Sequence, residues 1–335
     1  MEQIAFIIND RLIHWSSLMV ALGGAVAVCL FVWLYTRQTQ NWQGAGWMLL
    51  LSCPLSIFFS RLIHWYCRYS SYPSFSAAVT DYSVGGYALI GVFAGCLVAA
   101  LLLRLTRRVS SLGELLDCTC IAGAAGIAVG RLSCFFSPDD QGMLLTDITR
   151  LPIANCLTNP ITGQEEYRLA TFMLQSIAAA ALFLVLLHFY LIRCKRSAHY
   201  RDGDVFWIFM VVYSALQAVL DSTRYDSLFL RSNGFVSLVQ ILCLVTLVVT
   251  MVVFSLRMVK GMGWNPGFLL LWIPALALLG GAGYMEYYVQ RHGNQAAFAY
   301  SSMSLCLGSY VLLALGIRWI AVRVNRQPNI WQQTV

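Results

Sequence analysis

The chain has 335 residues, of which 59% are hydrophobic and only 11% are charged. This balance is too apolar for a soluble domain covered by a polar surface, so a lipid bilayer is the solvent that fits. The net charge of +7 would suggest nucleic acid as a partner of a soluble protein, but the basic residues lie in short connections between apolar runs, where they signal topology. We therefore expect a membrane protein without a nucleic-acid partner.

Taken in chain order, nine apolar runs are long enough to cross a bilayer as helices. They cover residues 16–36, 45–66, 86–106, 113–132, 170–192, 205–223, 235–256, 266–287 and 298–321. The runs are uninterrupted rather than alternating, and in hydrocarbon only helices or closed barrels satisfy all backbone groups. The sequence therefore predicts an all-α fold, a polytopic transmembrane helix bundle of about nine spans.

The charges between the runs predict the orientation, because lysine and arginine collect in cytoplasmic loops. The basic residues fall on alternate connections: Arg37; Arg104, Arg107 and Arg108; Arg193, Lys195, Arg196 and Arg201; Arg257 and Lys260; and Arg318, Arg323 and Arg326. Acidic residues gather on or near the other set of connections. We therefore predict an amino terminus outside the membrane and a carboxy terminus in the cytoplasm.

The longest outer connection, residues 133–169, contains several prolines and is predicted to form an irregular extracytoplasmic cap. It can serve as a surface for a partner or simply close the helix bundle. Cys67, Cys134 and Cys156 fall on the predicted outer side, so one disulfide can form there, although the sequence does not choose the pair. The cysteines lack metal-ligand spacing, and we predict neither a metal nor another cofactor.

Ionisable side chains inside membrane spans are costly, so each is a candidate functional residue. Arg61 and His64 lie one helical turn apart at the predicted outer end of the second span, as binding residues or as side chains that reach the interface. Arg131 closes the fourth span, where its guanidinium suits a lipid phosphate or an interfacial anchor. Asp117 is expected to cap the start of that span or to pair with an arginine.

The sixth span carries a polar stripe at Tyr213, Gln217, Asp221 and Arg224. Successive members are four, four and three residues apart, a spacing that places them on one face of a helix. Such a face contacts protein or a polar cavity. A catalytic site and a buried structural network both fit this pattern.

The run Gly130–Gly142 has the sequence G-R-L-S-C-F-F-S-P-D-D-Q-G. It resembles the signature G-R-x-G-N/C-F-x-x-G-x-x-x-G of the prolipoprotein diacylglyceryl transferases. Four further segments are similar to segments of that family in the same order: Gly85–Gly91, Leu115–Asp117, Tyr213–Asp226 and Val239–Gln240. The resemblance covers roughly residues 10–250. It implies a family domain of seven spans at residues 1–260, followed at 261–335 by two additional transmembrane helices and a short cytoplasmic tail.

The resemblance implies a reaction at the outer face of a bacterial cytoplasmic membrane. The diacylglyceryl group of phosphatidylglycerol passes to the lipobox cysteine thiol of a prolipoprotein, and glycerol phosphate leaves. The expected partners are phosphatidylglycerol, membrane lipid and lipoprotein precursor peptides. Together with the polar residues above, it indicates as catalytic residues Arg131, Asp221 and Arg224, and as substrate-binding residues Arg61, His64, Gly85, Gly86, Tyr87, Cys134, Tyr213 and Gln217.

Two side chains depart from the family pattern in a way that affects the chemistry. Ile90 stands where the family has the His or Tyr proposed for acid–base work, and Gln217 stands where it has a second essential arginine. Isoleucine cannot transfer a proton, and glutamine lacks the charge that stabilises a departing phosphate. The chain is then an enzyme in which Tyr87, His64 or Asp139 replaces the base, a non-catalytic paralogue that binds phospholipid or lipoprotein precursor, or an unrelated membrane transporter.

Overall fold

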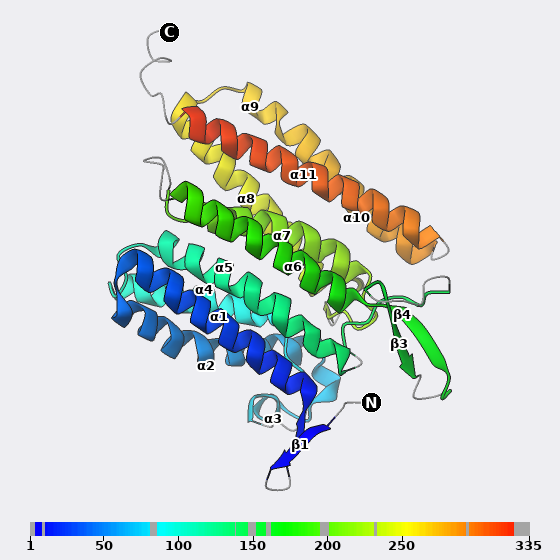
Figure 1. Ribbon diagram of the computed structural model, residues 1–335. Helices are drawn as coiled ribbons and strands as arrows, with labels where there is room; N and C mark the ends of the chain where they lie inside the picture. Colours follow the sequence, from blue (N-terminus) through cyan, green and yellow to red (C-terminus); the bar gives the residue numbers. More distant parts are fainter. Residues whose placement is uncertain are drawn as a thin grey trace. The chain divides into compact units, whose positions relative to one another are not determined.

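The computed structural model describes residues 4–8, 11–80, 86–137, 139–146, 152–158, 162–194, 201–230, 233–292 and 295–324. In this part of the chain, eight helices are long and apolar enough to cross a membrane, and a further apolar helix, α4, is shorter (Figure 1). These helices are α1 (Trp15–Thr39), α2 (Trp42–Cys67), α4 (Leu89–Leu105), α5 (Leu112–Gly130), α6 (Thr171–His188), α7 (Asp204–Ser222), α8 (Leu238–Met262), α10 (Trp272–Arg291) and α11 (Ala296–Val324). Each predicted apolar run coincides with one of them, so the polytopic helical fold is confirmed. The orientation in the membrane stays a prediction.

The chain divides into two compact units. The first comprises Met1–Lys195, Arg201–Phe206 and Thr223–Leu238. The second comprises Arg196–Tyr200, Trp207–Ser222 and Val239–Val335. Helix α7 therefore begins in the first unit and continues in the second. The boundary at residue 260, which rests on the family resemblance, is a different division and stays a proposal.

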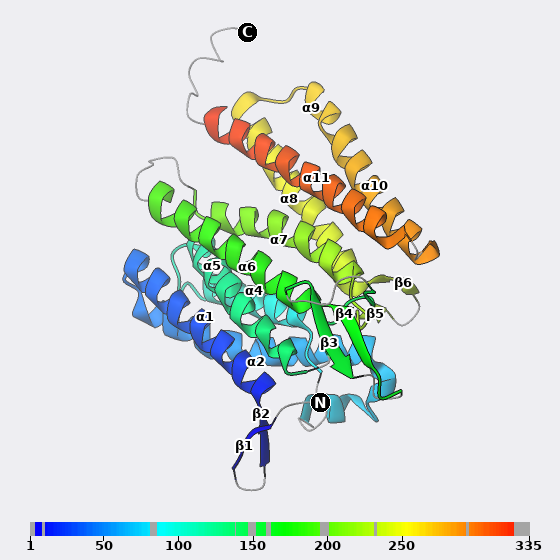
Figure 2. The same ribbon diagram turned by 45° about the vertical axis from the view of Figure 1, so that its right-hand side comes forward.

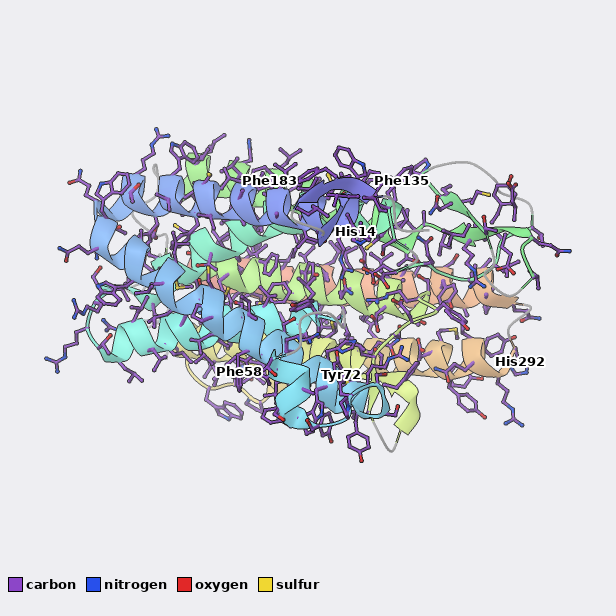
Figure 3. All side chains as sticks on the ribbon, turned by 90° about the horizontal axis from the view of Figure 1, so that it is seen from below. His14, Phe58, Tyr72, Phe135, Phe183 and His292 are labelled. Carbon is purple, nitrogen blue, oxygen red and sulfur yellow. The ribbon has the colours of Figure 1, made fainter. Side chains whose placement is uncertain are left out.

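In the first unit the helices pack in pairs, α2 against α4, α1 against α5 and α5 against α6 (Figures 1 and 2). Lipid supplies no hydrophobic drive between helices, so small residues that let backbones approach are favoured at their contacts. A Cβ at Gly91 of α4 would lie 2.3 Å from the Cα of Ser60 in α2, and one at Gly23 of α1 would lie 2.7 Å from the carbonyl oxygen of Gly126 in α5. These glycines allow both helix pairs to approach closely. Figure 3 shows the side chains on the helices. Phe58 of α2, labelled there, is exposed and does not take part in these close helix contacts.

The start of α7 is held by a carboxylate from α5. The backbone N–H groups of Gly203 and Phe206 donate to Asp117 at 2.8 and 2.6 Å, and the Asp117 side chain is fully buried. Unpaired N–H groups at a helix start carry a partial positive charge, which a carboxylate satisfies. Asp117 thus acts as a structural cap as expected, but it caps the start of α7 rather than the start of its own helix.

The described residues form three antiparallel hairpins. The first, β1 (Ile4–Ile8) with β2 (Arg11–His14), precedes α1; β3 (Ala154–Thr158) with β4 (Glu165–Leu169) precedes α6, and β5 (Phe229–Leu230) with β6 (Asn233–Ser237) lies between α7 and α8. The β3–β4 hairpin lies inside the connection 133–169 that was predicted to be irregular, so that part of the prediction is wrong. Each of its strands has five residues, too few for a clear alternation of apolar and polar positions. The first two hairpins and the short helix α3 (Phe75–Thr80) lie at one end of the first unit's helices, the predicted outer end (Figures 1 and 2).

The second unit has its own core, formed by α8, α11, the short helix α9 (Gly267–Leu270), α10 and most of α7. The hydroxyl of Tyr310 in α11 donates to the backbone carbonyl of Leu247 in α8 at 2.9 Å. The carboxylate of Glu286 in α10 accepts a hydrogen bond from the hydroxyl of Ser222 at the end of α7, at 2.5 Å, and one from Gln290 at 3.0 Å. Buried polar groups therefore join the last helices to α7 and α8 within this unit.

Candidate active site

Two arginines of the first unit converge on one carboxylate. Arg131 begins the 3-10 helix η2 (Arg131–Phe135), which continues α5, and Arg224 follows the end of α7. Both guanidinium groups form ion pairs with Asp140, that of Arg224 at 2.5 Å between Nη2 and Oδ1. The Asp140 side chain is 7% exposed and each arginine side chain is 13% exposed. The structure thus brings together the two arginines that the sequence associated with a lipid phosphate.

A second carboxylate, Asp226, completes a cluster without net charge. Nε of Arg224 donates to Oδ1 of Asp226 at 3.1 Å, and the backbone N–H of Asp140 donates to Oδ2 of Asp226 at 3.2 Å. From the end of α2, Nη2 of Arg68 donates to the backbone carbonyl of Asp226 at 3.3 Å. The side chains of Arg131, Arg224, Asp140 and Asp226, here called the arginine–aspartate cluster, carry two charges of each sign. Burial favours this neutrality, because an uncompensated buried charge is costly.

Backbone pairing, rather than helix geometry, positions Arg224. The sequence placed this residue on the helical stripe of the sixth span, but α7 ends at Ser222, so the prediction is wrong for Arg224. The segment after the helix instead pairs with the signature segment. Arg224 is an antiparallel partner of Gly142, and the N–H of Tyr225 donates to the carbonyl of Gln141 at 2.9 Å. These backbone hydrogen bonds compete with continuation of the helix.

The thiol of Cys134 contacts the arginine–aspartate cluster. Its Sγ donates to Oδ2 of Asp140 at 3.4 Å, and Nε2 of Gln141 donates to its carbonyl at 3.4 Å. A buried thiol therefore already contacts the carboxylate that the two arginines share. Cys67, Cys134 and Cys156 are all free cysteines in the structure, so the disulfide that the sequence left open is not formed.

Arg61 lies at the centre of a second cluster at the predicted outer end of α2. Its side chain is 1% exposed, which excludes the interpretation that it reaches the interface. Nη1 of Arg61 donates to the backbone carbonyl of Gly86 at 3.0 Å and to the hydroxyl of Tyr72 at 3.4 Å. The guanidinium also lies over the rings of Tyr72 and Tyr87, at 5.5 and 5.0 Å from their centroids. Arg61 therefore binds the segment around Gly86 to α2.

His64 lies against the same segment. Its Nδ1 is 2.8 Å from the hydroxyl of Tyr72, which is labelled in Figure 3. Gly86 has a φ of +113°, and a Cβ there would lie 2.3 Å from Cε1 of His64. Only glycine suits both this backbone conformation and the imidazole against it. We call Arg61, His64, Tyr72, Gly86 and Tyr87 the Arg61–His64 cluster; Gly85, also a predicted binding residue, lies outside the described residues.

Asp139 interacts with residues at both the arginine–aspartate cluster and the Arg61–His64 cluster. Its carboxylate accepts a hydrogen bond from the hydroxyl of Ser137 at 2.7 Å and interacts electrostatically with both His64 and Cys134. All of these residues belong to the first unit. This unit therefore holds guanidinium groups, carboxylates, a thiol and an imidazole in one polar site at the predicted outer end of its helices.

Comparison with known proteins decides the family. Residues 3–256 match the prolipoprotein diacylglyceryl transferase family. The chain belongs to this family. A phosphatidylglycerol–prolipoprotein diacylglyceryl transferase of Lactococcus lactis is 26% identical over 263 residues, which cover 78% of this chain and 96% of the relative. Proteins of the same name from Limosilactobacillus reuteri and Bacillus licheniformis are 26% and 22% identical, over 79% and 74% of this chain and 94% and 92% of their own lengths.

Family membership confirms the resemblance and leaves the unrelated transporter without support. Together with the apolar helices, it also confirms the predicted localisation, a bacterial cytoplasmic membrane crossed several times. The match ends within α8, so α9, α10 and α11 lie beyond the matched residues.

The remaining predicted site residues of the family pattern lie on α7 in the second unit. The ring of Tyr213 stacks on that of Phe209, with centroids 5.1 Å apart. Gln217 and Asp221 are buried, and Asp221 interacts electrostatically with Cys243 of α8. Tyr213, Gln217 and Asp221 thus lie along one helix of the second unit, and two of the three are buried.

Sequence reasoning missed three residues of the site: Asp140, Asp226 and Tyr72. Asp226 is the last position of the family's sixth-span pattern, so that pattern could have found it. Tyr72 lies in a stretch rich in tyrosine and serine that suits an interfacial arm equally well. Asp140 falls on a variable position of the signature, and no signal in the sequence singles it out.

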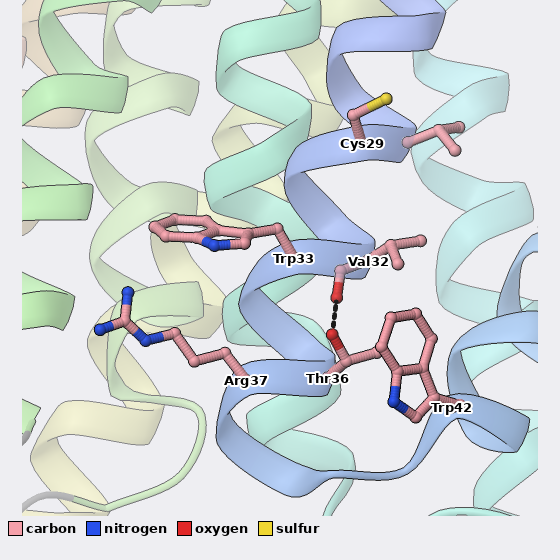
Figure 4. A pocket seen from close by; sticks show the side chains of 7 residues that line it. Cys29, Val32, Trp33, Thr36, Arg37 and Trp42 are labelled. Carbon is pink, nitrogen blue, oxygen red and sulfur yellow. Dashed lines mark hydrogen bonds between the residues drawn. The ribbon is translucent and has the colours of Figure 1, made fainter.

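A pocket toward the other end of α1 contains none of the site residues. It is lined by Val28, Cys29, Val32, Trp33, Thr36, Arg37 and Trp42 (Figure 4). The hydroxyl of Thr36 donates to the carbonyl of Val32 at 2.6 Å, and the guanidinium of Arg37 lies 5.4 Å from the ring centroid of Trp33. Because these polar groups already have partners within α1, the pocket is not a candidate for the transfer reaction.

Proposed function

We propose that this chain transfers the diacylglyceryl group of phosphatidylglycerol to the lipobox cysteine of prolipoproteins at the outer face of the membrane. The observation that carries the proposal is the convergence of Arg131 and Arg224 on one anionic group in the first unit. The names of the curated relatives, phosphatidylglycerol–prolipoprotein diacylglyceryl transferases, support the proposal that phosphatidylglycerol and prolipoproteins are the substrates. Peptide precursors and phosphatidylglycerol are the partners this function requires.

The two arginines would bind the phosphate of the lipid and stabilise its departure. A guanidinium offers a planar pair of donors that matches phosphate oxygens. In the reaction the thiolate sulfur forms a bond to the glycerol carbon that carries the phosphate. The bond from that carbon to oxygen breaks, and its electron pair leaves with glycerol phosphate. Charge grows on the phosphate as the bond breaks, so fixed cations accelerate this step.

His64 is our candidate for the group that takes the thiol proton. Ile90 cannot do so. His64 of α2, however, places its imidazole against Gly86, four residues before Ile90 in the segment Gly85–Gly91. In the tautomer that this role requires, Nδ1–H of His64 donates to the hydroxyl oxygen of Tyr72, which fixes the ring orientation and leaves Nε2 as the acceptor for the thiol proton. Tyr87 and Asp139 are weaker candidates, since Arg61 covers the ring of Tyr87 and Ser137 binds the carboxylate of Asp139.

The experiment is a transfer assay with purified protein in phosphatidylglycerol liposomes and a lipobox peptide, read by the mass gain of the peptide. We expect wild-type protein to give the diacylglyceryl thioether, and Arg131→Ala to lower the rate at least about 100-fold. Arg104→Ala is the matched control, because among the described residues that arginine donates to the backbone carbonyls of Val109 and Ser110, at the opposite end of the unit. An unmodified peptide with stably folded wild-type protein would contradict the proposal.

A second candidate function is a non-catalytic paralogue that binds phospholipid or lipoprotein precursor. The replacements at Ile90 and Gln217 favour it. If the wild-type chain is inactive while the double variant Ile90→His and Gln217→Arg transfers the group, the chain is a lapsed enzyme. If His64→Gln removes activity from the wild-type chain at unchanged phosphatidylglycerol affinity, the imidazole has replaced the missing base and the second candidate fails.

A further inference from the structure

The side chain of Asp140 has features that a permanent structural ion pair does not need. It binds the guanidinium groups of both Arg131 and Arg224, the two residues proposed to hold the lipid phosphate. Its φ is +55°, a left-handed conformation that few residues other than glycine, asparagine and aspartate adopt. This conformation directs a carboxylate between the two arginines, where an anion of the substrate would have to lie.

The attachment of the carboxylate is also incomplete. Oδ1 is buried and lies 2.5 Å from Nη2 of Arg224, yet it accepts no well-oriented hydrogen bond from a described residue. Oδ2 carries the ion pair with Arg131 and the thiol contact of Cys134. A tetrahedral phosphate offers oxygens in more directions than a planar carboxylate, so it can meet two guanidinium groups with better geometry.

Charge balance points the same way. The arginine–aspartate cluster is neutral with Asp140 in place, and a phosphodiester carries one negative charge, as a carboxylate does. Exchange of one for the other leaves the cluster neutral. If phosphatidylglycerol bound while Asp140 stayed, the cluster would hold three anions and two cations, and an unbalanced charge in a largely buried site is costly. Arg224 keeps Asp226 as a partner in either case.

We propose that Asp140 is an internal competitor for the phosphate: its carboxylate binds Arg131 and Arg224 when no phospholipid is bound, and the phosphodiester displaces it. This inference rests on the proposed function, since it concerns the same phosphate site. A site that is open for one-tenth of the time binds its ligand about tenfold more weakly than a permanently open site. Removal of the Asp140 charge therefore increases the affinity for phosphatidylglycerol.

The test is a titration of phosphatidylglycerol onto full-length protein in detergent micelles, followed by native mass spectrometry. We expect Asp140→Asn to lower the Kd for phosphatidylglycerol about tenfold and to leave the Kd for diacylglycerol, which lacks phosphate, unchanged. Glu166→Gln is the matched control, because Glu166 also pairs with an arginine, Arg168, but outside the cluster. An equal or weaker phosphatidylglycerol affinity of folded Asp140→Asn would overturn the proposal.

A second measurement covers a variant that is poorly folded. Glycerol phosphate should raise the melting temperature of Asp140→Asn more than that of the wild type, because it occupies the position that the carboxylate left. Equal stabilisation of both proteins, or an Asp140→Asn that does not fold with or without glycerol phosphate, would mean that Asp140 is structural.

The Arg131→Ala variant separates this inference from the proposed function. If it binds phosphatidylglycerol as tightly as the wild type, the phosphate site is wrongly assigned and the proposed function loses its main support. If it binds more weakly while Asp140→Asn binds no more tightly, only the displacement of Asp140 is wrong.

Discussion

The substitution Arg224→Gln removes the guanidinium that Asp140 and Asp226 share. The two carboxylates are close, since the N–H of Asp140 donates to Oδ2 of Asp226, and Arg131 alone remains to balance them. Loss of one partner from a buried ion pair costs about 3–5 kcal/mol. Asp226 is 32% exposed, so solvent screens part of this cost, and we expect a loss of about 3 kcal/mol of unfolding free energy. Denaturant titration of the protein in detergent measures it.

The same substitution removes one of the two cations that would stabilise the leaving phosphate, so the transfer rate should fall about 100- to 1000-fold. The double variant Arg224→Gln and Asp140→Asn removes one charge of each sign. We expect it to regain stability to within about 1 kcal/mol of the wild type, but not activity. Arg168→Gln, which breaks the pair with Glu166, should cost no more than about 1 kcal/mol.

Two results would refute this reasoning. If the double variant recovers the wild-type transfer rate, Arg224 has only a structural role. If Arg224→Gln is as stable as the wild type, the ion pairs of the arginine–aspartate cluster do not contribute to folding, and the neutral cluster is not a requirement of burial.

Three further substitutions test the framework of the site. Gly86→Ala should lower the transfer rate at least tenfold and the free energy of unfolding by about 1–3 kcal/mol, because its Cβ would displace the imidazole of His64 and its φ is positive. A variant that stays active and stable would show that His64 does not lie against Gly86. Gly91→Ala should destabilise the α2–α4 pair by about 2 kcal/mol or more. Gly123→Ala should be neutral in the same unfolding assay, because its Cβ would meet no atom of another described element within 4 Å. Asp117→Asn should cost about 1–2 kcal/mol through the start of α7 without a change in phosphatidylglycerol affinity; an altered affinity would show that this cap acts on the site.

The sequence predicts the helices well because the bilayer constrains them strongly. A span must be long and apolar, and no alternation or tertiary contact is needed to recognise it. The structure differs from the predicted spans at their ends and by a turn at Leu271, which divides the predicted span 266–287 into α9 and α10. Arg131 could also be predicted, since an arginine that closes an apolar run is conspicuous at membrane depth.

The rest of the site depends on contacts between distant segments, which spacing along the chain does not encode. The end of α7 at Ser222 follows from pairing between Arg224 and Gly142, and helical periodicity cannot foresee it. The position of His64 depends on the positive φ of Gly86. Asp140 could not be predicted for a further reason: its neighbour Asp139 is also an aspartate. Only the structure shows which of the two carboxylates pairs with the arginines.

The replacement at Gln217 also becomes easier to interpret. Gln217 and Asp221 are both buried on α7, four residues and therefore one helical turn apart. An arginine at position 217 would have the Asp221 carboxylate within reach, so Gln217→Arg does not strand a positive charge inside the second unit. The restoring double variant with Ile90→His is thus expected to fold. Its transfer rate then reports on chemistry rather than on damage to the protein, and a rate equal to that of the wild type would mean that neither replaced position limits the reaction in this chain.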